Sequence, residues 1–394
     1  MGTNRRSFLK TGAVAATALS WGRVLGANER IRLGAIGTGG RCQYLLGLLK
    51  RLNRSDLMAV CDVYGPRRSE ARQKYGTDAT REYVDYREVL DRQDLDAVII
   101  GAPDHWHVRM AVDSVQAGKD VYLEKPVTHS ISEEDRLRTA VKQSGRVVQT
   151  GTQQRSWPHF IEARERIRAG ELGTVTLIKT FWYQSYLKRA DVGGREVDLA
   201  QLDWQRWLGS APQQPYDADR FFNWRWFWDF GGGALTDLFT HWVDVAHWYM
   251  GQDNPIAVQG MGDVHLLHHL ECPDTVSAAL RYPGNFTVQY TGTMIGYLEG
   301  GGLIFRGTKG MLKLYRAGYS FYPELSSYSE DPANDKPSLE VKSEGDGAVQ
   351  HLANFLDCLE SRKEPNAPVG VGITAARAGH LANQAIRSEA WVRT

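Results

Sequence analysis

The segment from Ile31 to Leu49 constrains the fold more than any other part of the 394-residue chain. An apolar run leads into a turn rich in glycine, and leucines at helical spacing follow. Gly37 and Gly39 match the first two glycines of a Gly-x-Gly-x-x-Gly fingerprint, and Cys42 occupies the third position. In that fingerprint the helix N-terminus receives a pyrophosphate. The segment therefore predicts a dinucleotide site, and the alternative is a glycine turn that binds no dinucleotide.

An acidic residue follows at the distance expected of a ribose ligand. Asp62 ends the apolar run 57–61, twenty residues after Cys42. An acid at this point accepts hydrogen bonds from the ribose hydroxyls and favours NAD. Arg67 and Arg68, just downstream, have the charge to meet the 2′-phosphate of NADP. Both cofactors stay open, with NAD favoured.

Apolar runs and helical patterns alternate over the first part of the chain. The apolar runs lie at 95–100, 120–123 and 147–150, and the helical patterns lie at 105–117 and 132–144. Short, wholly apolar runs are typical of strands buried in a parallel sheet. We therefore predict a Rossmann-type, doubly wound α/β domain over residues 31–155, with ligands at the carboxyl ends of its strands.

The pattern changes after a helical stretch at 158–169. Runs rich in β-branched and aromatic residues lie at 175–186, 275–282, 285–291, 303–306 and 311–315. We predict an α+β domain over residues 156–394 with an open, mostly antiparallel sheet. Helices at 349–361 and 373–389 are expected to pack back against the body, and the polar stretch 326–344 reads as an exposed loop.

The first thirty residues have the features of an export signal. Arg5 and Arg6 precede Phe-Leu-Lys, a short apolar stretch and small residues that end at Ala27. This order is typical of a twin-arginine signal, so we expect a periplasmic or otherwise exported protein. The alternative is a basic, disordered N-terminus. The apolar part is shorter than the roughly 20 residues that span a bilayer, so we expect no stable membrane span.

Composition excludes some classes of function. The 47 basic and 46 acidic residues are spread along the chain, so nucleic acid is not an expected partner. The four cysteines are far apart and form no Cys-x-x-Cys pair, so no metal or redox site is predicted from them. A metal site made from histidines and Asp237 can be drawn, but the sequence spacing gives it no support.

Three motifs at the expected carboxyl ends and beyond carry a family resemblance. They are the run 102–107 (Ala-Pro-Asp-His-Trp-His), the triplet Glu124-Lys125-Pro126, and the run 231–244, which contains Asp237 and His241. Together with the glycine turn, the chain resembles the glucose-fructose oxidoreductase/inositol dehydrogenase (Gfo/Idh/MocA) family over nearly all of its length after the signal. The run 203–209 and the helical stretch 375–387 resemble the exported branch of that family.

The resemblance implies that Lys125, Asp237 and His241 are the catalytic residues. Oxidation of an alcohol requires its hydroxyl proton to leave, and histidine suits that transfer. A lysine beside the nicotinamide orients the hydroxyl and stabilises negative charge on its oxygen. Asp237 and His241 are spaced to share one helical face. The alternatives are purely structural roles: Lys125 only ends a strand, and Asp237 and His241 only cap and line a buried helix.

The resemblance and the motifs together define two sets of binding residues. The cofactor set is Gly37, Thr38, Gly39, Gly40, Arg41, Asp62, Arg67, Pro103, His107, Glu124 and Lys125. The substrate set is His105, Trp106, Gln153, Tyr183, Trp224 and Trp226. The resemblance also implies a carbohydrate substrate and homo-oligomers formed through the C-terminal sheet.

Three functions fit these expectations. The first is an NAD(P)-dependent sugar oxidoreductase that keeps its cofactor bound and returns the hydride, since no pool of NAD exists outside the cytoplasm. The second is an NAD-dependent glycoside hydrolase that works by transient oxidation and elimination. The third is a carbohydrate-binding protein that retains a dinucleotide without turnover.

Overall fold

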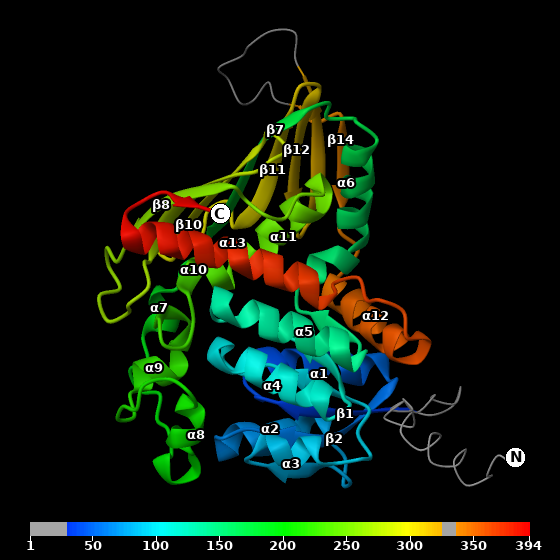
Figure 1. The fold of residues 1–394 in the computed structure, drawn as a ribbon, viewed down its shortest axis with the longest axis vertical. Coiled ribbons are helices and arrows are strands. Elements are labelled where there is room, and N and C mark those ends of the chain that lie inside the picture. The colour runs from blue at the N-terminus through cyan, green and yellow to red at the C-terminus, as the bar shows by residue number, and fades with distance from the viewer. Residues whose placement is uncertain (1–29, 325–335) are drawn as a thin grey trace, which may run out of the picture.

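The computed structural model describes residues 30–324 and 336–394. The predicted twin-arginine segment, from Asn4 to Ala27, lies outside these residues. Two sheets organise the described chain. The first has six strands and the second has nine, and Figure 1 shows them in the lower and upper parts of the molecule.

The first sheet is a parallel Rossmann sheet with the strand order β3-β2-β1-β4-β5-β6. Its strands are β1 (Ile31–Ile36), β2 (Ser55–Cys61), β3 (Arg81–Tyr83), β4 (Ala97–Ile100), β5 (Asp120–Leu123) and β6 (Val148–Thr150). The connecting helices are α1 (Gly40–Leu52), α2 (Gly65–Tyr75), α3 (Tyr86–Leu90), α4 (Asp104–Gln116) and α5 (Glu134–Ser144). Every residue of β4 and β5 is buried, which explains their lack of polar alternation.

Each face of this sheet has its own core. Val98 and Ile100 point into one core with residues of α4, and Ile99 points into the other with leucines of α1. Helix α12 (Gly347–Ser361) joins the second core through Leu352 and Phe355. The C-terminal part of the chain therefore completes the Rossmann domain.

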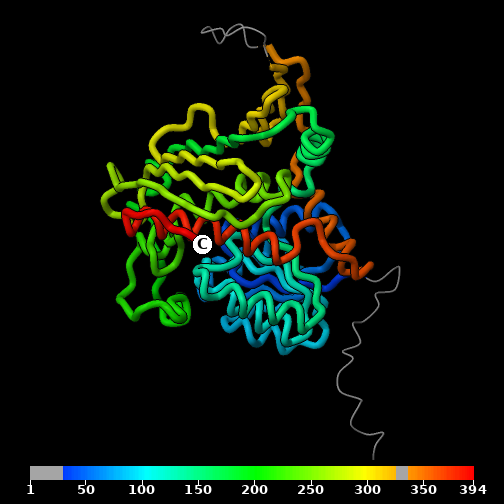
Figure 2. Tube along the Cα trace, turned by 45° about the horizontal axis from the view of Figure 1, so that its top comes forward, coloured from blue at the N-terminus to red at the C-terminus, as the bar shows by residue number. Residues whose placement is uncertain are grey.

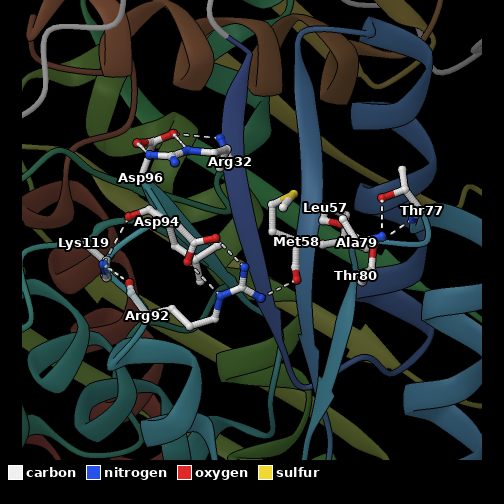
Figure 3. Close-up of polar contacts among 11 residues, drawn as sticks. Arg32, Leu57, Met58, Thr77, Ala79, Thr80, Arg92, Asp94, Asp96 and Lys119 are labelled. Atoms are coloured by element: carbon white, nitrogen blue, oxygen red, sulfur yellow. Dashed lines mark hydrogen bonds and ion pairs between the residues drawn. The ribbon is translucent and has the colours of Figure 1, made fainter.

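Polar contacts hold the edge of the sheet that lies opposite the carboxyl ends. Arg32, at the start of β1, binds Asp96, which precedes β4. Arg92 binds both oxygens of Asp94 and donates to the carbonyl of Met58, as Figure 3 shows. Lys119 donates to the carbonyl of Arg92 in the same group. The polar side chains named here therefore bind one another or nearby backbone carbonyls.

The second sheet has the order β14-β13-β12-β11-β7-β10-β9-β8-β15. Only the central pair β7–β10 is parallel among its described pairings. The strands are β7 (Val175–Tyr183), β8 (Ala257–Asp263), β9 (Thr275–Arg281), β10 (Thr287–Thr293), β11 (Gly301–Gly307), β12 (Gly310–Tyr315), β13 (Gly318–Pro323), β14 (Leu339–Lys342) and β15 (Val392–Arg393).

Helices cover one face of the second sheet. They are α6 (Pro158–Arg168), α11 (Phe239–Met250) and α13 (Val369–Ser388). Alternate residues of β9, namely Val276, Ala278 and Leu280, are buried against this layer. Helix α13 also contacts β6, and Figure 1 shows it crossing the molecule between the two sheets.

A segment of the second domain extends alongside the Rossmann domain. It contains the short helices α7 (Leu187–Ala190), α8 (Trp204–Leu208) and α9 (Ala218–Phe222), and α10 (Gly233–Asp237) follows it. Figures 1 and 2 both show this green segment beside the lower domain. Asp203 N–H donates to the Val63 carbonyl at 3.0 Å, so the segment reaches the end of β2.

The predicted fold class is confirmed: a doubly wound parallel sheet is joined to a mostly antiparallel sheet domain. Residues 326–335 of the expected exposed loop lie outside the described residues, and over 339–342 the expectation was wrong, because β14 pairs with β13 there. Strand β14 was not predicted because its residues are polar and at least partly exposed, and an edge strand needs few apolar residues.

Candidate functional site

A cavity of about 600 Å³ lies where the carboxyl ends of the Rossmann strands face the second domain. Its walls come from the segments after β1, β2, β4 and β5, and from β7, the α10–α11 junction and the turn after β12. Most of the residues predicted from the sequence line it: Gly37, Gly39, Gly40, Arg41, Asp62, Arg67, Pro103, Trp106, His107, Glu124, Lys125, Gln153, Trp224, Asp237 and His241.

The glycine turn forms one end of this cavity. Gly37 has φ of 77°, and a Cβ atom there would lie 2.5 Å from the backbone nitrogen of Ala102. Gly39 is the N-cap of α1 and has no side-chain cap, while a Cβ on Gly39 or Gly40 would meet no atom within 4 Å. The open space and the uncapped N–H groups fit a dinucleotide pyrophosphate.

Cys42 replaces the third glycine of the fingerprint without loss of close packing. It is fully buried at the start of α1. A Cβ on Gly101, which follows β4, would lie 2.9 Å from the Cβ of Cys42. The glycine that permits close approach is therefore on the facing segment instead of the helix.

Asp62 lies at the end of β2 and lines the cavity. Its carboxylate accepts hydrogen bonds from the N–H groups of Thr38 at 2.8 Å and Tyr64 at 2.9 Å. Thr38 itself is buried and does not line the cavity, because it faces this carboxylate. Arg67 lines the cavity with its guanidinium 4.4 Å from the ring centre of Phe221. Both predicted ribose-end side chains thus face the site.

Arg41 and Glu124 form an ion pair between α1 and the end of β5. Arg41 Nε donates to Glu124 Oε1 at 2.7 Å. Arg41 Nη2 is buried and has no hydrogen-bond partner among the described residues. The pair leaves a guanidinium donor beside the dinucleotide seat, which fits a phosphate ligand.

Lys125 and Asp237 form an ion pair across the boundary between the two domains. Lys125 Nζ donates to Asp237 Oδ1 and to the Asp237 carbonyl, each at 2.6 Å. Arg225 Nε donates to the same Oδ1 at 3.2 Å. Burial opposes ionisation of Asp237, but the charges of Lys125 and Arg225 outweigh it and hold the pKa of Asp237 below its ordinary value. The carboxylate therefore stays charged and orients the lysine.

Asp237 and His241 line the same cavity, but the helix that carries them is broken between them. Helix α10 ends at Asp237 and α11 begins at Phe239, and His241 N–H donates to the Leu238 carbonyl at 3.3 Å. The Asp237 carbonyl, which a continuous helix would use for His241, accepts from Lys125. Lys125 thus occupies the acceptor that the helix gives up at its break.

His241 lies in the same cavity as Lys125. Its ring stacks on Trp182, with centres 5.9 Å apart and planes at 23°. Burial, followed by the charges of Lys125 and Arg316, lowers the pKa of His241 well below its ordinary value. The imidazole is therefore neutral at neutral pH and able to accept a proton.

The two histidines of the 102–107 motif have different surroundings. His107 lines the cavity, and its ring nitrogens lie 2.6 Å from the Pro126 carbonyl oxygen and 2.8 Å from that of Ala102. It thus links the two loops that follow β4 and β5. His105 does not line the cavity, because its Nε2 bonds the Trp207 carbonyl at 3.0 Å inside the core, where burial lowers its pKa to about 3.

Tyr183 was predicted in the substrate set, but it points away from the cavity. Its hydroxyl bonds Thr291 on β10 at 2.7 Å. Trp182 and Gln184 line the cavity instead. The reason is the alternation of a strand, which sends neighbouring side chains to opposite faces.

Trp226 is also corrected, because it is buried in the core and packs edge-on against Tyr186. Trp224, two residues earlier, lines the cavity with the Arg225 guanidinium 4.1 Å from its ring centre. The short 3-10 helix at Trp224–Trp226 puts the two indoles in different surroundings.

Several polar residues that line the cavity were not predicted from the sequence. They are Asp104, Gln184, Arg189, Arg195, Arg206, Arg225 and Arg316. Asp104 follows Pro103 at the start of α4, and burial raises its pKa well above the ordinary range although Arg225 opposes this. Its position inside the 102–107 motif was the available signal. Arg316 carries no local signal, since only the sheet register brings it to the site.

Within residues 30–324 and 336–394, no group of three or more His, Cys, Asp or Glu side chains is arranged to hold a metal ion. In the same part of the chain, none of the helices has the length and apolar character needed to cross a membrane.

Family models match both domains. Residues 31–152 match a model described as an oxidoreductase family with an NAD-binding Rossmann fold. Residues 160–313 match the GFO/IDH/MocA C-terminal domain.

Curated relatives match over part of their length. The chain is 29% identical over 224 residues to inositol 2-dehydrogenase of Salmonella typhimurium (strain LT2), which covers 57% of this chain and 54% of that protein. It is 31% identical over 161 residues to Glycosyl hydrolase family 109 protein 2 of Shewanella sp. (strain ANA-3), which covers 34% of this chain and 35% of that protein. The chain thus spans about half the length of the first relative and about a third of the second.

A solved structure resembles the whole fold. Levoglucosan dehydrogenase, in complex with NADH and levoglucosan, superposes with a TM-score of 0.73 at 18% identity. The match covers 93% of this chain and 99% of that one.

Proposed function

Because the chain belongs to the GFO/IDH/MocA oxidoreductase family and has an NAD-binding Rossmann domain, we propose that it is an NAD-dependent oxidoreductase of a sugar or polyol hydroxyl. One observation carries the proposal: Lys125, Asp237 and His241 line a single cavity beside the glycine turn. The inositol dehydrogenase relative supports this substrate class.

The side chains suit removal of a proton from an alcohol. The neutral His241 ring accepts the hydroxyl proton of the substrate. Lys125, held by Asp237 and so oriented, donates to the substrate oxygen and stabilises the charge that develops there. When bound, NAD supplies the acceptor for the hydride that leaves the carbon.

The residues that would hold NAD lie on the Rossmann side. The uncapped N–H groups at Gly39 and Gly40 receive the pyrophosphate, and Arg41 donates from its free nitrogen. Asp62 accepts from the ribose, in addition to the backbone bonds it already makes. Arg67 has the charge for a 2′-phosphate, so NADP stays the alternative cofactor.

We propose that the protein is exported and recycles its cofactor. The paired Arg5 and Arg6 and the apolar stretch after them support twin-arginine export. That route carries folded proteins, and a dinucleotide loaded before export must then be regenerated by a second substrate or by the product. Homo-oligomers through the second sheet are part of the same proposal.

A glycoside hydrolase is the second candidate. The Glycosyl hydrolase family 109 protein favours it, because it is 31% identical over the matched region. The same proton acceptor and bound NAD serve both reactions, since a transient oxidation acidifies the neighbouring C–H bond before the leaving group departs. The carbohydrate-binding alternative needs no residues for proton transfer.

The test compares Lys125→Met with Lys119→Met. Lys119 is buried and binds the carbonyls of Arg92 and Leu95, at the edge of the sheet opposite Lys125. Each purified protein is incubated with sugars, polyols and aryl glycosides while nicotinamide absorbance and released aglycone are followed. We expect Lys125→Met to lose at least about 100-fold in kcat, because it loses a donor to the reacting oxygen.

The pattern of products separates the candidates. Reduction of the nicotinamide by a free sugar supports the oxidoreductase, and aglycone release without net reduction supports the hydrolase. Equal activity of Lys125→Met and wild type would contradict the proposal. Binding of sugars by wild type without any change at the nicotinamide would leave the carbohydrate-binding alternative.

A further inference from the structure

Arg316 lies in the turn after β12 and reaches the cavity beside the proposed proton acceptor. Its guanidinium carbon lies 5.0 Å from the ring centre of Trp182, and Trp182 stacks on His241. Arg316 also contributes to the lowered pKa of His241. The guanidinium therefore belongs to the substrate side of the cavity.

Two guanidinium nitrogens of Arg316 lack a partner. Nε and Nη2 are both buried, and neither makes a hydrogen bond to any described residue. Burial, and then the charge of Arg41, lowers the pKa of Arg316 to about 10, so the side chain is still charged at neutral pH. A buried charge without a partner is costly, which makes an absent anionic ligand the natural explanation.

Several neighbouring cations in the cavity have an acidic partner. Lys125 and Arg225 share Asp237, and Arg41 binds Glu124. Arg206 lies within 3.7 Å of Asp85. Arg316 has no ion-pair partner among the described residues: its guanidinium faces two indole rings, and the charge of Asp346 acts on it only from beyond ion-pair distance.

The unpartnered edge of Arg316 has the geometry of a carboxylate site. Nε and Nη2 are the two nitrogens that bind both oxygens of a carboxylate side-on. The molecule uses this edge elsewhere: Arg92 binds the two oxygens of Asp94 through Nε at 2.9 Å and Nη2 at 2.5 Å, as Figure 3 shows. Arg32 binds Asp96 through the same two nitrogens.

The charge of the cavity exceeds what a dinucleotide neutralises. Among the described residues, eight cationic side chains and four carboxyl groups line it. Burial raises the pKa of one of the four, Asp104, and so disfavours its charge. The two phosphates of NAD leave a positive excess, which favours an anionic second ligand.

We propose that Arg316 binds an oxyanion group of the substrate, a carboxylate or a phosphate, so that the substrate is an acidic sugar and not a neutral one. This inference rests on the proposed function, because it names the substrate class of the same site. The alternative source of the oxyanion is the dinucleotide itself. Arg41, at the pyrophosphate seat, is close enough for its charge to act on Arg316, but Arg316 comes from the second domain and adjoins the Trp182–His241 stack.

The experiment compares Arg316→Met and Arg316→Lys with Arg206→Met. Arg206→Met removes the same charge from the cavity wall but takes away an arginine that already has acidic partners. The protein with its bound dinucleotide is titrated at constant ionic strength with D-glucuronate, D-galacturonate and D-glucose 6-phosphate, each matched with D-glucose or D-galactose. The readouts are the midpoint of thermal unfolding, KM where turnover occurs, and the dinucleotide content of each variant.

We expect at least one acidic sugar to stabilise wild type and Arg206→Met more than its neutral partner does. Arg316→Met should bind that sugar at least about 10-fold more weakly, because a hydrogen-bonded charge pair is lost. Arg316→Lys keeps the charge but loses the two-nitrogen edge, so it should fall between them. Without sugar, Arg316→Met should unfold at the wild-type temperature or above, since it removes a buried unpaired charge.

Three results would overturn the inference. They are equal effects of acidic and neutral sugars, undiminished acidic-sugar binding by Arg316→Met, and loss of the dinucleotide from Arg316→Met. The last result would assign Arg316 to the cofactor. If neutral sugars reduce the nicotinamide equally in wild type and Arg316→Met, the proposed function stands and only this inference fails. If wild type contains no dinucleotide and takes none up, the proposed function fails.

Discussion

The two halves of the cavity are built by different means. The cofactor half is made chiefly of backbone: the positive φ of Gly37, the uncapped helix start at Gly39, and the N–H groups that hold Asp62. The substrate half is made of side chains from distant segments, and these include Lys125, His241 and Arg316. One half depends on a local turn, and the other depends on how two domains pack.

This difference explains how each half tolerates change in sequence. A backbone site needs small residues where the chain approaches the ligand, and it accepts Cys42 because Gly101 supplies the missing space. A side-chain site needs particular chemical groups at a fixed distance. Asp237 shows this requirement, because its carboxylate and its carbonyl both bind Lys125. We therefore expect substitutions in the two halves to fail in different ways.

The largest effect should come from alanine at the two glycines of the turn. Gly39→Ala adds a methyl group in open space, so its free energy of unfolding without ligand should stay within about 0.5 kcal/mol of wild type. The same methyl group blocks the approach of the pyrophosphate, so NADH affinity should fall at least about 10-fold. Denaturant unfolding and NADH fluorescence titration measure the two quantities.

Gly37→Ala is the matched control for this prediction. Its Cβ meets the Ala102 backbone and its φ is positive, so it should cost at least about 2 kcal/mol of folding free energy. If Gly39→Ala unfolds as easily as Gly37→Ala, the cofactor half is not the open seat described above.

A smaller effect concerns the pH dependence of the substrate half. The pKa of His241 is lowered, so the folded protein protonates this ring only well below its ordinary pKa of about 6.5. If neutral His241 accepts the proton, kcat/KM should be level from pH 8 down to about 6.5 and should fall only in more acidic solution.

Lys125→Met sharpens this prediction. It removes a positive charge that lowers the pKa of His241, so the acidic limb of the residual activity should move to higher pH. An acidic limb of wild type centred above pH 7, or one that does not move in the variant, would argue against His241 as the acceptor.

The fold and the cofactor half could be predicted because their signals are local. The glycine turn, Asp62 and the apolar strands each occupy a few consecutive residues, and the NAD-binding Rossmann domain is confirmed. Thr38 was predicted in the cofactor set but does not line the cavity, because its side chain faces Asp62.

The substrate half was predicted less completely, for a physical reason. Strand alternation selects Trp182 over Tyr183, and the buried face of β7 is known only after the sheet is assembled. His105 and Trp226 were wrongly placed there, because the packing of neighbouring rings turns them into the core. Arg316 and Arg225 reach the site only through contacts between segments far apart in sequence.

The most direct test of the central claim is the dinucleotide content of the purified, folded protein. After denaturation, the released nucleotides are identified by mass spectrometry and counted per chain. We predict about one NAD or NADH per chain, held at the glycine turn. A folded protein that releases no dinucleotide, and that shows no change in NADH fluorescence when NADH is added, would contradict the claim.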